Sequence, residues 1–239
     1  MKDNAPDETV IDQLRIALET EVLPKAARDH AAHLLKRLSS PVRVSLLGRP
    51  GSGKSELVNM FVGRRLLPND AKLPTLELTY GPAEKITVTG ANGRNKVFDS
   101  LDFDKAAKGG PAFIRAEMPL QILERISLLE VVTDGAVTEL QSAVDWAVRR
   151  TDIALWCTQY FSDEERMLWS RVPDSLKDHA FLVLAKADVL SADNALSGRI
   201  SDLETVVAEE FHSLFAVATL QAIKAHQANG KVDEAVYHA

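Results

Sequence analysis

The sequence has one cysteine among its 239 residues, and only 6% of its residues are aromatic. A single cysteine excludes a disulfide within the chain and a cysteine-based metal cluster. Cys157 lies in the apolar run at 153–157, where a small buried side chain is its expected role. The apolar fraction of 46% and the charged fraction of 26% are those of an ordinary globular protein.

The sequence also lacks an excess of basic residues and any long apolar run. Lys and Arg number 28 against 34 Asp and Glu, which gives a formal net charge of -6. This balance argues against general nucleic-acid binding, because that function usually needs a basic face. No apolar run approaches the roughly 20 residues that cross a bilayer, and the acidic N-terminus differs from a signal peptide. We therefore expect a cytoplasmic protein with no nucleic-acid partner and no integral membrane segment.

Strand and helix patterns alternate along most of the chain. Apolar or alternating runs typical of strands occur at 42–47, 76–80, 85–89, 96–98, 126–132, 153–158, 181–185 and 214–217. Helical patterns occur at 56–62, 136–149, after a capping box at 162–165, at 197–213 and at the C-terminal end. Polar residues at 99–112 predict an irregular loop. This order predicts an α/β fold with a doubly wound, mostly parallel sheet.

Residues 8–38 form a predicted N-terminal helical appendage. Apolar residues recur at helical spacing before and after Pro24, which predicts a break into two helices. Two interpretations are open: the helices pack on the flank of the main domain, or they dock a partner or a second copy. We expect two domains, with N-terminal helices at 1–40 and a P-loop domain at 41–239.

The most specific motif is Gly48-Arg49-Pro50-Gly51-Ser52-Gly53-Lys54-Ser55. It matches G-x-x-x-x-G-K-[ST] between a predicted buried strand and a predicted helix. Glycines let main-chain N–H groups point at phosphate oxygens, the lysine reaches the terminal phosphates, and the serine hydroxyl ligates Mg²⁺. The motif predicts nucleotide contacts from Gly48, Gly51, Ser52, Gly53, Lys54 and Ser55, with Lys54 also acting in catalysis.

A second motif, Ala185-Lys186-Ala187-Asp188, follows a predicted buried strand where GTPases carry [NT]-K-x-D. The Asp188 carboxylate can accept two hydrogen bonds from guanine that adenine cannot donate, and the stem of Lys186 can pack along the base. The pattern therefore predicts GTP or GDP, bound with Mg²⁺. An ATP-dependent P-loop enzyme would require other roles for Lys186 and Asp188, and no kinase-like substrate motif is present.

Four segments, read in order, resemble the GTPase domain of the bacterial dynamin-like family. They are the lead-in at 40–48, the stretch at 66–81 that contains Pro74-Thr75, and the segments at 151–166 and 182–190. The resemblance implies that Thr75 is the switch threonine, which completes the Mg²⁺ shell and helps to place the attacking water. It implies that Ala218, in the loop at 216–219, contacts guanine. It also implies a protein partner or a homodimer, formed through the nucleotide face or the N-terminal helices.

The sequence departs from the family where D-x-x-G should follow the strand at 126–132. If Glu130 replaces the Asp, Thr133 stands at the glycine position; if Asp134 is the acid, the spacing differs and Gly135 directly follows it. Both assignments are open, and we take Ser55, Thr75 and Glu130 as the candidate metal ligands. In the segment Ala185-Lys186-Ala187-Asp188, which we call the base motif, Ala185 replaces the usual Asn or Thr. We also expect no room for the long helical stalk of the family.

A further departure concerns catalysis. Pro50 and Gly51 stand where the family often carries a polar or basic catalytic residue, and neighbouring Arg49 is a candidate to offset phosphate charge. Two functions follow. The first is a slow GTPase that acts as a switch. The second is a degenerate G domain that holds nucleotide as a protein-interaction module without turnover.

Overall fold

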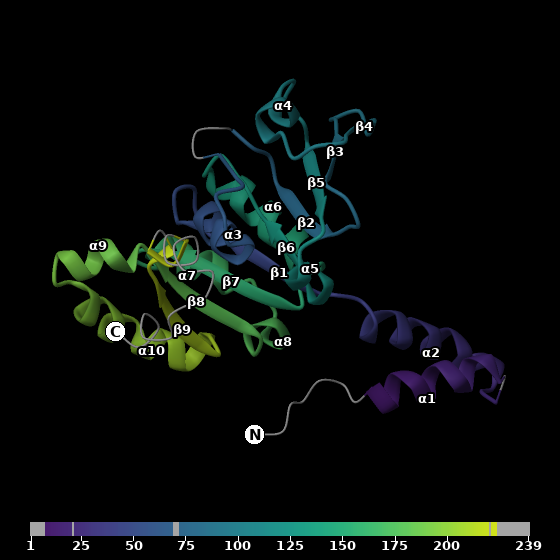
Figure 1. The fold of residues 1–239 in the computed structure, drawn as a ribbon. Helices are drawn as coiled ribbons and strands as arrows, with labels where there is room; N and C mark the ends of the chain where they lie inside the picture. Colours follow the sequence, from purple (N-terminus) through teal and green to yellow (C-terminus); the bar gives the residue numbers. More distant parts are fainter. Residues whose placement is uncertain (1–7, 21, 69–71, 220, 224–239) are drawn as a thin grey trace. The chain divides into compact units, whose positions relative to one another are not determined.

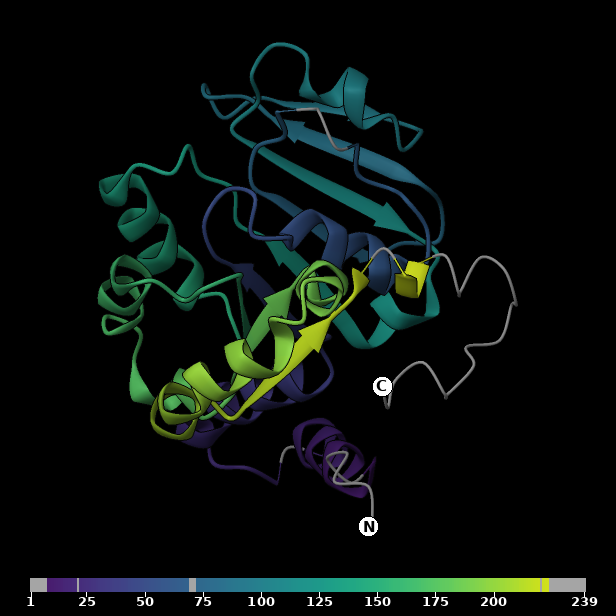
Figure 2. The same cartoon turned by 90° about the vertical axis from the view of Figure 1, so that its left-hand side faces the viewer.

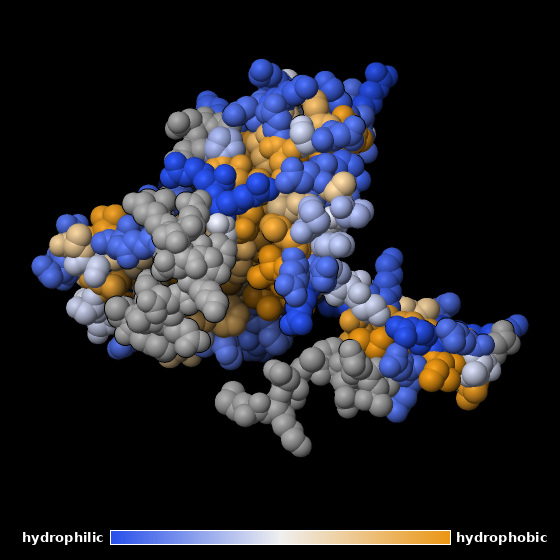
Figure 3. All heavy atoms as spheres, viewed as in Figure 1, coloured by the Kyte–Doolittle hydropathy of each residue, from blue (hydrophilic) through white to orange (hydrophobic). Residues whose placement is uncertain are grey.

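The computed structural model describes residues 8–20, 22–68, 72–219 and 221–223, and it divides the chain into two compact units, Met1–Pro41 and Val42–Ala239. The first unit is a pair of helices, α1 (Glu8–Glu19) and α2 (Lys25–Leu38), with Pro24 as the N-cap of α2 (Figure 1). The predicted break at Pro24 is confirmed. Apolar residues are visible on the surface of this pair (Figure 3). The side chains of Ile16 and Leu34 are each more than half exposed.

The second unit is built on one nine-stranded sheet with the order β4-β3-β5-β2-β6-β1-β7-β8-β9 (Figures 1 and 2). The strands are β1 (Val42–Leu47), β2 (Leu76–Tyr80), β3 (Lys85–Thr89), β4 (Asn95–Phe98), β5 (Phe113–Met118), β6 (Ile126–Glu130), β7 (Ile153–Thr158), β8 (Ala180–Ala185) and β9 (Ser213–Val217). Strands β6, β1, β7, β8 and β9 pair in parallel, whereas β2 is antiparallel to β6 and β3 is antiparallel to both its neighbours. The predicted α/β fold with a mostly parallel sheet is confirmed.

Helices cover both faces of this sheet. They are α3 (Lys54–Val62), α4 (Phe103–Ala107), α5 (Gln121–Arg125), α6 (Val137–Val148), α7 (Asp163–Trp169), α8 (Asp174–Lys177), α9 (Ala187–Ala192) and α10 (Leu196–Glu210). One apolar cluster joins the sheet to α3, α4 and α5, and a second joins it to α6, α7, α8 and α10. Alternate residues of the central strands enter the two clusters, so β1 sends Val44 and Leu46 to one and Leu47 to the other.

Parallel pairing brings the carboxyl ends of five strands to one edge of the sheet. Glu130, Thr158, Ala185 and Val217 end β6, β7, β8 and β9 there, beside the loop that follows β1. Ligands of open α/β sheets bind at this edge. The antiparallel strand β2 begins at the same edge, because Leu76 pairs with Glu130.

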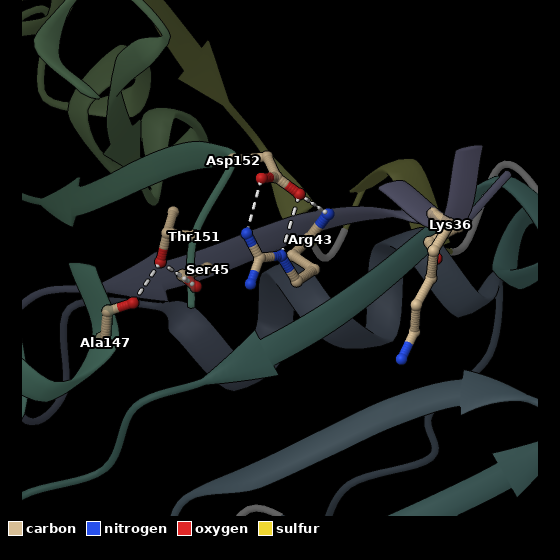
Figure 4. A network of polar contacts seen from close by, with 7 residues as sticks. Lys36, Arg43, Ser45, Ala147, Thr151 and Asp152 are labelled. Carbon is tan, nitrogen blue, oxygen red and sulfur yellow. Dashed lines mark hydrogen bonds and ion pairs between the residues drawn. The ribbon is translucent and has the colours of Figure 1, made fainter. Parts of the chain in front are cut away.

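The opposite edge is fastened by side chains from β1 and from the turn before β7 (Figure 4). Arg43 donates two hydrogen bonds to the Asp152 carboxylate, at 3.0 Å from Nε and 2.7 Å from Nη2. The hydroxyls of Ser45 and Thr151 lie 2.7 Å apart, and Thr151 donates to the Ala147 carbonyl at 2.7 Å. These contacts fix β7 against β1, and so they set the register of the strands that carry the site.

Several predicted elements differ from the structure. The loop at 99–112 contains α4, whose Phe103 and Ala106 are buried and whose first turn is capped by the Asp102 carboxylate. Strand β5 and helices α5, α8 and α9 were not predicted, and β6 and α10 end earlier than expected, at Glu130 and Glu210. The C-terminal helix falls almost entirely outside the described residues. In the described part of the chain, no helix has both the length and the apolar character of a membrane-spanning segment.

Candidate functional site

The loop between β1 and α3 carries the predicted phosphate motif, and we call it the phosphate loop. It curves tightly against the end of β7. Gly48 has φ +131°, and a Cβ there would lie 2.2 Å from the Cys157 carbonyl oxygen, so only glycine fits. Cys157 is fully buried, and burial raises the pKa of its thiol to about 12. A fully buried thiol with a raised pKa is a poor nucleophile, which agrees with the packing role expected from the sequence.

Lys54 is buried at the start of α3, with 6% of its surface exposed. Its ammonium donates to the main-chain carbonyls of Gly48, at 2.9 Å, and of Arg49, at 2.8 Å. Burial lowers the pKa of Lys54, and the nearby charge of Glu130 opposes that shift. A cation held this way inside the loop can bind an anion that enters the loop, and an anion beside it would strengthen its charged form.

Ser55 and Glu130 meet beside Lys54. The Ser55 hydroxyl donates to Glu130 Oε1 at 2.6 Å, while Oε2 is buried without a partner among the described residues. Burial raises the pKa of Glu130, although the Ser55 hydrogen bond and the charge of Lys54 both favour its ionised form. Of the two candidate acids, Glu130 is the one beside the phosphate loop. Asp134 is exposed, and its Oδ1 accepts from the Ala136 N–H at 2.7 Å.

The raised pKa of Glu130 has a consequence for stability. The folded protein binds the carboxyl proton more tightly than the unfolded chain, so this group favours folding below its unfolded pKa of about 4.3, and the contribution is lost as pH rises through the folded pKa. Glu130→Gln is therefore expected to melt at a higher temperature than wild type at pH 8, without nucleotide or metal. The difference should shrink toward pH 4. Thermal unfolding across this range is the measurement, with exposed Glu124→Gln as the control. A lower melting temperature for Glu130→Gln at pH 8 would contradict the assignment.

Thr75 lies at the same edge of the sheet, immediately before β2. Its hydroxyl accepts from the Val132 N–H at 3.1 Å and donates to the Val132 carbonyl at 3.3 Å. Both contacts join the two loops that would face a nucleotide. As a metal ligand, Thr75 would have to give up at least one of them, so its role on Mg²⁺ stays a prediction.

The base motif is bound to the phosphate loop. Lys186, in a left-handed conformation after β8, donates from Nζ to the Gly51 carbonyl at 3.3 Å. Gln159, after β7, donates to the same carbonyl at 3.1 Å. A Cβ on Gly53 would lie 2.7 Å from that of Ala185, so the residue that replaces Asn or Thr touches the loop directly. Gln159 was not predicted from the sequence, because no motif marks it.

Asp188 and Ala218 follow the carboxyl ends of the paired strands β8 and β9. Asp188 lies in the first turn of α9, and its carboxylate has no hydrogen bond or ion pair within the described residues. Ala218 follows β9, whose Val217 pairs with Ala185. An unengaged carboxylate next to a main-chain loop can accept hydrogen bonds from a planar base edge.

Arg49 is paired with a residue outside the phosphate loop. Its guanidinium forms an ion pair with Glu164 on α7, and the two side chains are 42% and 58% exposed. The next residue, Glu165, is buried. Its carboxylate accepts from the Trp156 Nε1–H at 3.0 Å and from the Ser162 N–H at 2.8 Å, and the second bond is part of the predicted capping box. Arg49 would have to leave Glu164 to reach a phosphate, so its catalytic role stays a prediction.

A cleft of about 1500 Å³ opens beside the phosphate loop. At one end it is lined by Lys54, Ser55, Thr75, Glu130 and Thr133. Its lining also includes Trp146, on α6, and Arg150, which follows α6. Lys186 and Asp188 do not line it. The three predicted metal ligands and four of the predicted phosphate contacts, Gly51, Gly53, Lys54 and Ser55, therefore share one cleft, whereas Gly48 and Ser52 do not line it.

The comparisons with known proteins agree with this fold. Two solved chains of an oligomerised bacterial dynamin pair, described as sensing and tethering membranes over long range, align with 91% of this chain at a TM-score of 0.58 and 16% identity. The alignment spans 37% and 38% of those chains. The isoniazid-induced protein IniC of Mycobacterium tuberculosis, in two strains, is 39% identical over 61 residues, which is 24% of this chain and 12% of that protein. The chain matches no family model. The sheet, the phosphate loop and the alignment over nine-tenths of the chain identify its fold as that of a bacterial dynamin-like G domain.

Proposed function

We propose that this chain binds GTP and GDP with Mg²⁺ at the phosphate loop and works as a slow GTPase switch. The observation that carries the proposal is the joining of the two predicted motifs: Lys186 of the base motif donates to Gly51 of the phosphate loop. A nucleotide whose phosphates meet Lys54 can then present its base to the free carboxylate of Asp188. Gly48, Ser52, Gly53 and Ala218 supply main-chain atoms around that path.

The residues beside Lys54 fit a divalent cation. Hard cations take oxygen ligands, and Glu130 Oε2 is a buried carboxylate oxygen that lacks a partner in the described structure. The Ser55 hydroxyl, 2.6 Å from Glu130 Oε1, supplies a second oxygen, and Thr75 is the candidate third. Bound Mg²⁺ would offset the charge of the phosphate oxygens. The protein's own part is to hold these oxygens beside Lys54, whose charged form the nearby Glu130 favours.

The base assignment predicts guanine specificity. Wild type should prefer GTP over ATP by at least about a hundredfold, because a site built to hydrogen-bond one group rejects an analogue that lacks it. Asp188→Asn should erode this preference by weakening GTP binding while ATP binding stays weak. Titration with labelled GTP, GDP and ATP measures both affinities.

Asp193→Asn, at the exposed C-terminal end of α9, is the matched control and should bind as wild type does. Equal competition by ATP and GTP in the wild-type protein would rule out guanine recognition. The chain would then be a P-loop nucleotide-binding protein without guanine specificity.

A second function, a nucleotide-holding interaction module without turnover, rests on a different observation. Pro50 and Gly51 bring no side-chain donor to the phosphate loop, and Arg49 is paired with Glu164. The exposed apolar side chains of Met167 and Val189, on α7 and α9, would suit a protein partner or a second copy at the nucleotide face. The half-exposed apolar side chains of α1 and α2 are the other candidate contact. A measurement of GTP turnover distinguishes the two functions, because a GTPase switch hydrolyses GTP and a nucleotide-holding module does not.

A further inference from the structure

Part of the cleft is lined by residues that the proposed function does not use. Strand pairing puts Arg43 of β1 next to Ser127 of β6. It also puts Glu77 of β2 between Leu129 of β6 and Arg115 of β5. All five residues line the cleft. Residues that pair across strands send their side chains to the same face of a sheet, so four neighbouring strands form the floor of this part of the cleft.

Three arginines line this part of the cleft, and one of them has no carboxylate partner in the described structure. Arg43 donates two hydrogen bonds to Asp152, and Arg115 donates to Glu77 Oε2 at 2.9 Å. Arg150, which follows α6, forms no ion pair within the described residues. Because an arginine side chain stays charged in proteins, Arg150 brings a positive charge that an acidic group of a ligand can neutralise.

Arg150 is held against an aromatic ring. Its guanidinium lies 4.4 Å from the centre of the Trp146 ring and donates to the Trp146 carbonyl at 2.9 Å. The Trp146 ring meets the Phe113 ring edge-on, with their centres 6.3 Å apart, and Trp146 is 37% exposed. All three residues line the cleft. Trp and Arg often dominate binding at protein interfaces, so this exposed ring beside a fixed cation favours a ligand with an aromatic group next to a carboxylate.

The floor also holds a polar group without a partner. Ser127 is buried, with 8% of its surface exposed, and its hydroxyl has no hydrogen bond within the part of the chain that the structure describes. Most buried side-chain hydroxyls are paired with protein or with water. Because Ser127 lines the cleft, a main-chain N–H or carbonyl of a bound segment can supply that partner.

The exposure of these side chains favours a protein segment over a small molecule. Small-molecule sites usually enclose roughly 70–90% of the ligand surface. Here the side chain of Arg115 is 53% exposed, and Trp146 is also open to solvent. A segment that lies along an open floor can contact groups that are spread over several strands and one helix.

We propose that this part of the cleft, which we call the Trp146 groove, binds an extended acidic segment of a partner protein. A carboxylate of the segment pairs with Arg150, an adjacent aromatic side chain packs against Trp146 and Phe113, and the main chain of the segment reaches Ser127. The inference goes beyond the proposed function, because none of these four residues is assigned to the nucleotide and the groove forms without one.

The probe is the acidic peptide acetyl-EDFEDS-amide, and the readout is the indole N–H signal of Trp146 in ¹⁵N-labelled protein. The chain has three tryptophans, and the Trp146 signal is the one that Trp146→Phe lacks. This signal should move with the acidic peptide and stay in place with acetyl-KKFKKS-amide. Replacing the phenylalanine of the acidic peptide by alanine should weaken binding about fivefold, because the ring contact is lost.

Variants of the protein locate the bound peptide. Arg150→Gln should weaken binding of the acidic peptide at least about fivefold, through loss of a charged hydrogen bond. Arg149→Gln is the matched control: it removes the same charge from the adjacent exposed residue, which does not line the cleft, and it should bind as wild type does. Lys54→Ala should also bind the peptide as wild type does, which separates the Trp146 groove from the phosphate loop.

Three results would overturn the inference while the proposed function stands. They are a Trp146 signal that does not move with the acidic peptide, equal losses of affinity in Arg150→Gln and Arg149→Gln, and loss of peptide binding in Lys54→Ala. A Trp146 signal that moves with protein concentration alone would show that a second copy of the chain occupies the groove, and it would replace the partner segment as the occupant.

Discussion

Lys54→Ala is expected to abolish measurable nucleotide binding while the protein stays folded. The ammonium of Lys54 is buried within the phosphate loop, 2.9 Å from the Gly48 carbonyl and 2.8 Å from the Arg49 carbonyl, where it can reach more than one phosphate oxygen. Each charged hydrogen bond is worth about 1.5–3 kcal/mol, so loss of two or more should weaken binding by at least about a hundredfold. Fluorescent GDP titration measures this.

The fold should tolerate the change because the folded state gains little from this charge. Burial lowers the pKa of Lys54, which means that folding disfavours its protonated form. The melting temperature of Lys54→Ala without nucleotide should therefore stay close to that of wild type. Lys96→Ala, on the exposed strand β4, is the control that removes a lysine far from the loop. A folded Lys54→Ala protein with wild-type affinity would disprove the phosphate-site assignment.

The parts of the fold predicted from the sequence are those set by local pattern. Strands β7 and β8 are mostly buried on both faces, so their sequences are nearly continuous apolar runs. The capping box at Ser162 and Glu165 marks the start of α7, and the phosphate loop is recognised by residues that are adjacent in sequence. Each of these features needs only neighbours along the chain.

The parts that were missed depend on contacts between distant segments. Strand β5 alternates buried residues with more exposed ones, and it pairs with β2 and β3, which lie more than twenty residues earlier in the sequence. The polar stretch before it gives no sequence signal for where the strand begins. Helix α4 forms because Phe103 and Ala106 reach the apolar cluster. Gln159 reaches Gly51 only because β1 and β7 are neighbours. The choice between Glu130 and Asp134 was likewise left open by spacing, and it depends on which carboxylate the register of β6 brings to Ser55.

Binding and turnover can separate in this chain, because they depend on different groups. Donors that hold the third phosphate equally in the ground state and in the transition state raise affinity without raising the rate. A faster hydrolysis rate requires groups that stabilise the charge on the third phosphate in the transition state and that position the attacking water. Pro50 and Gly51 offer no such side chain, and the Thr75 hydroxyl is bonded to Val132.

Intrinsic GTP hydrolysis is therefore expected to be very slow even where GTP binds well. Removal of one transition-state donor from an enzyme costs about 10²–10³ in rate, and ordinary enzymes turn over at about 1–10³ s⁻¹, so we expect a rate below about 10⁻² s⁻¹. Single-turnover hydrolysis with Mg²⁺, at low and high protein concentration, measures the rate and detects activation by a second copy. Arg49→Ala should leave the rate unchanged if the Arg49–Glu164 ion pair keeps the guanidinium away from the phosphates. Turnover near 1 s⁻¹ would show instead that another group compensates for Pro50 and Gly51, and it would exclude the interaction module that holds nucleotide without turnover.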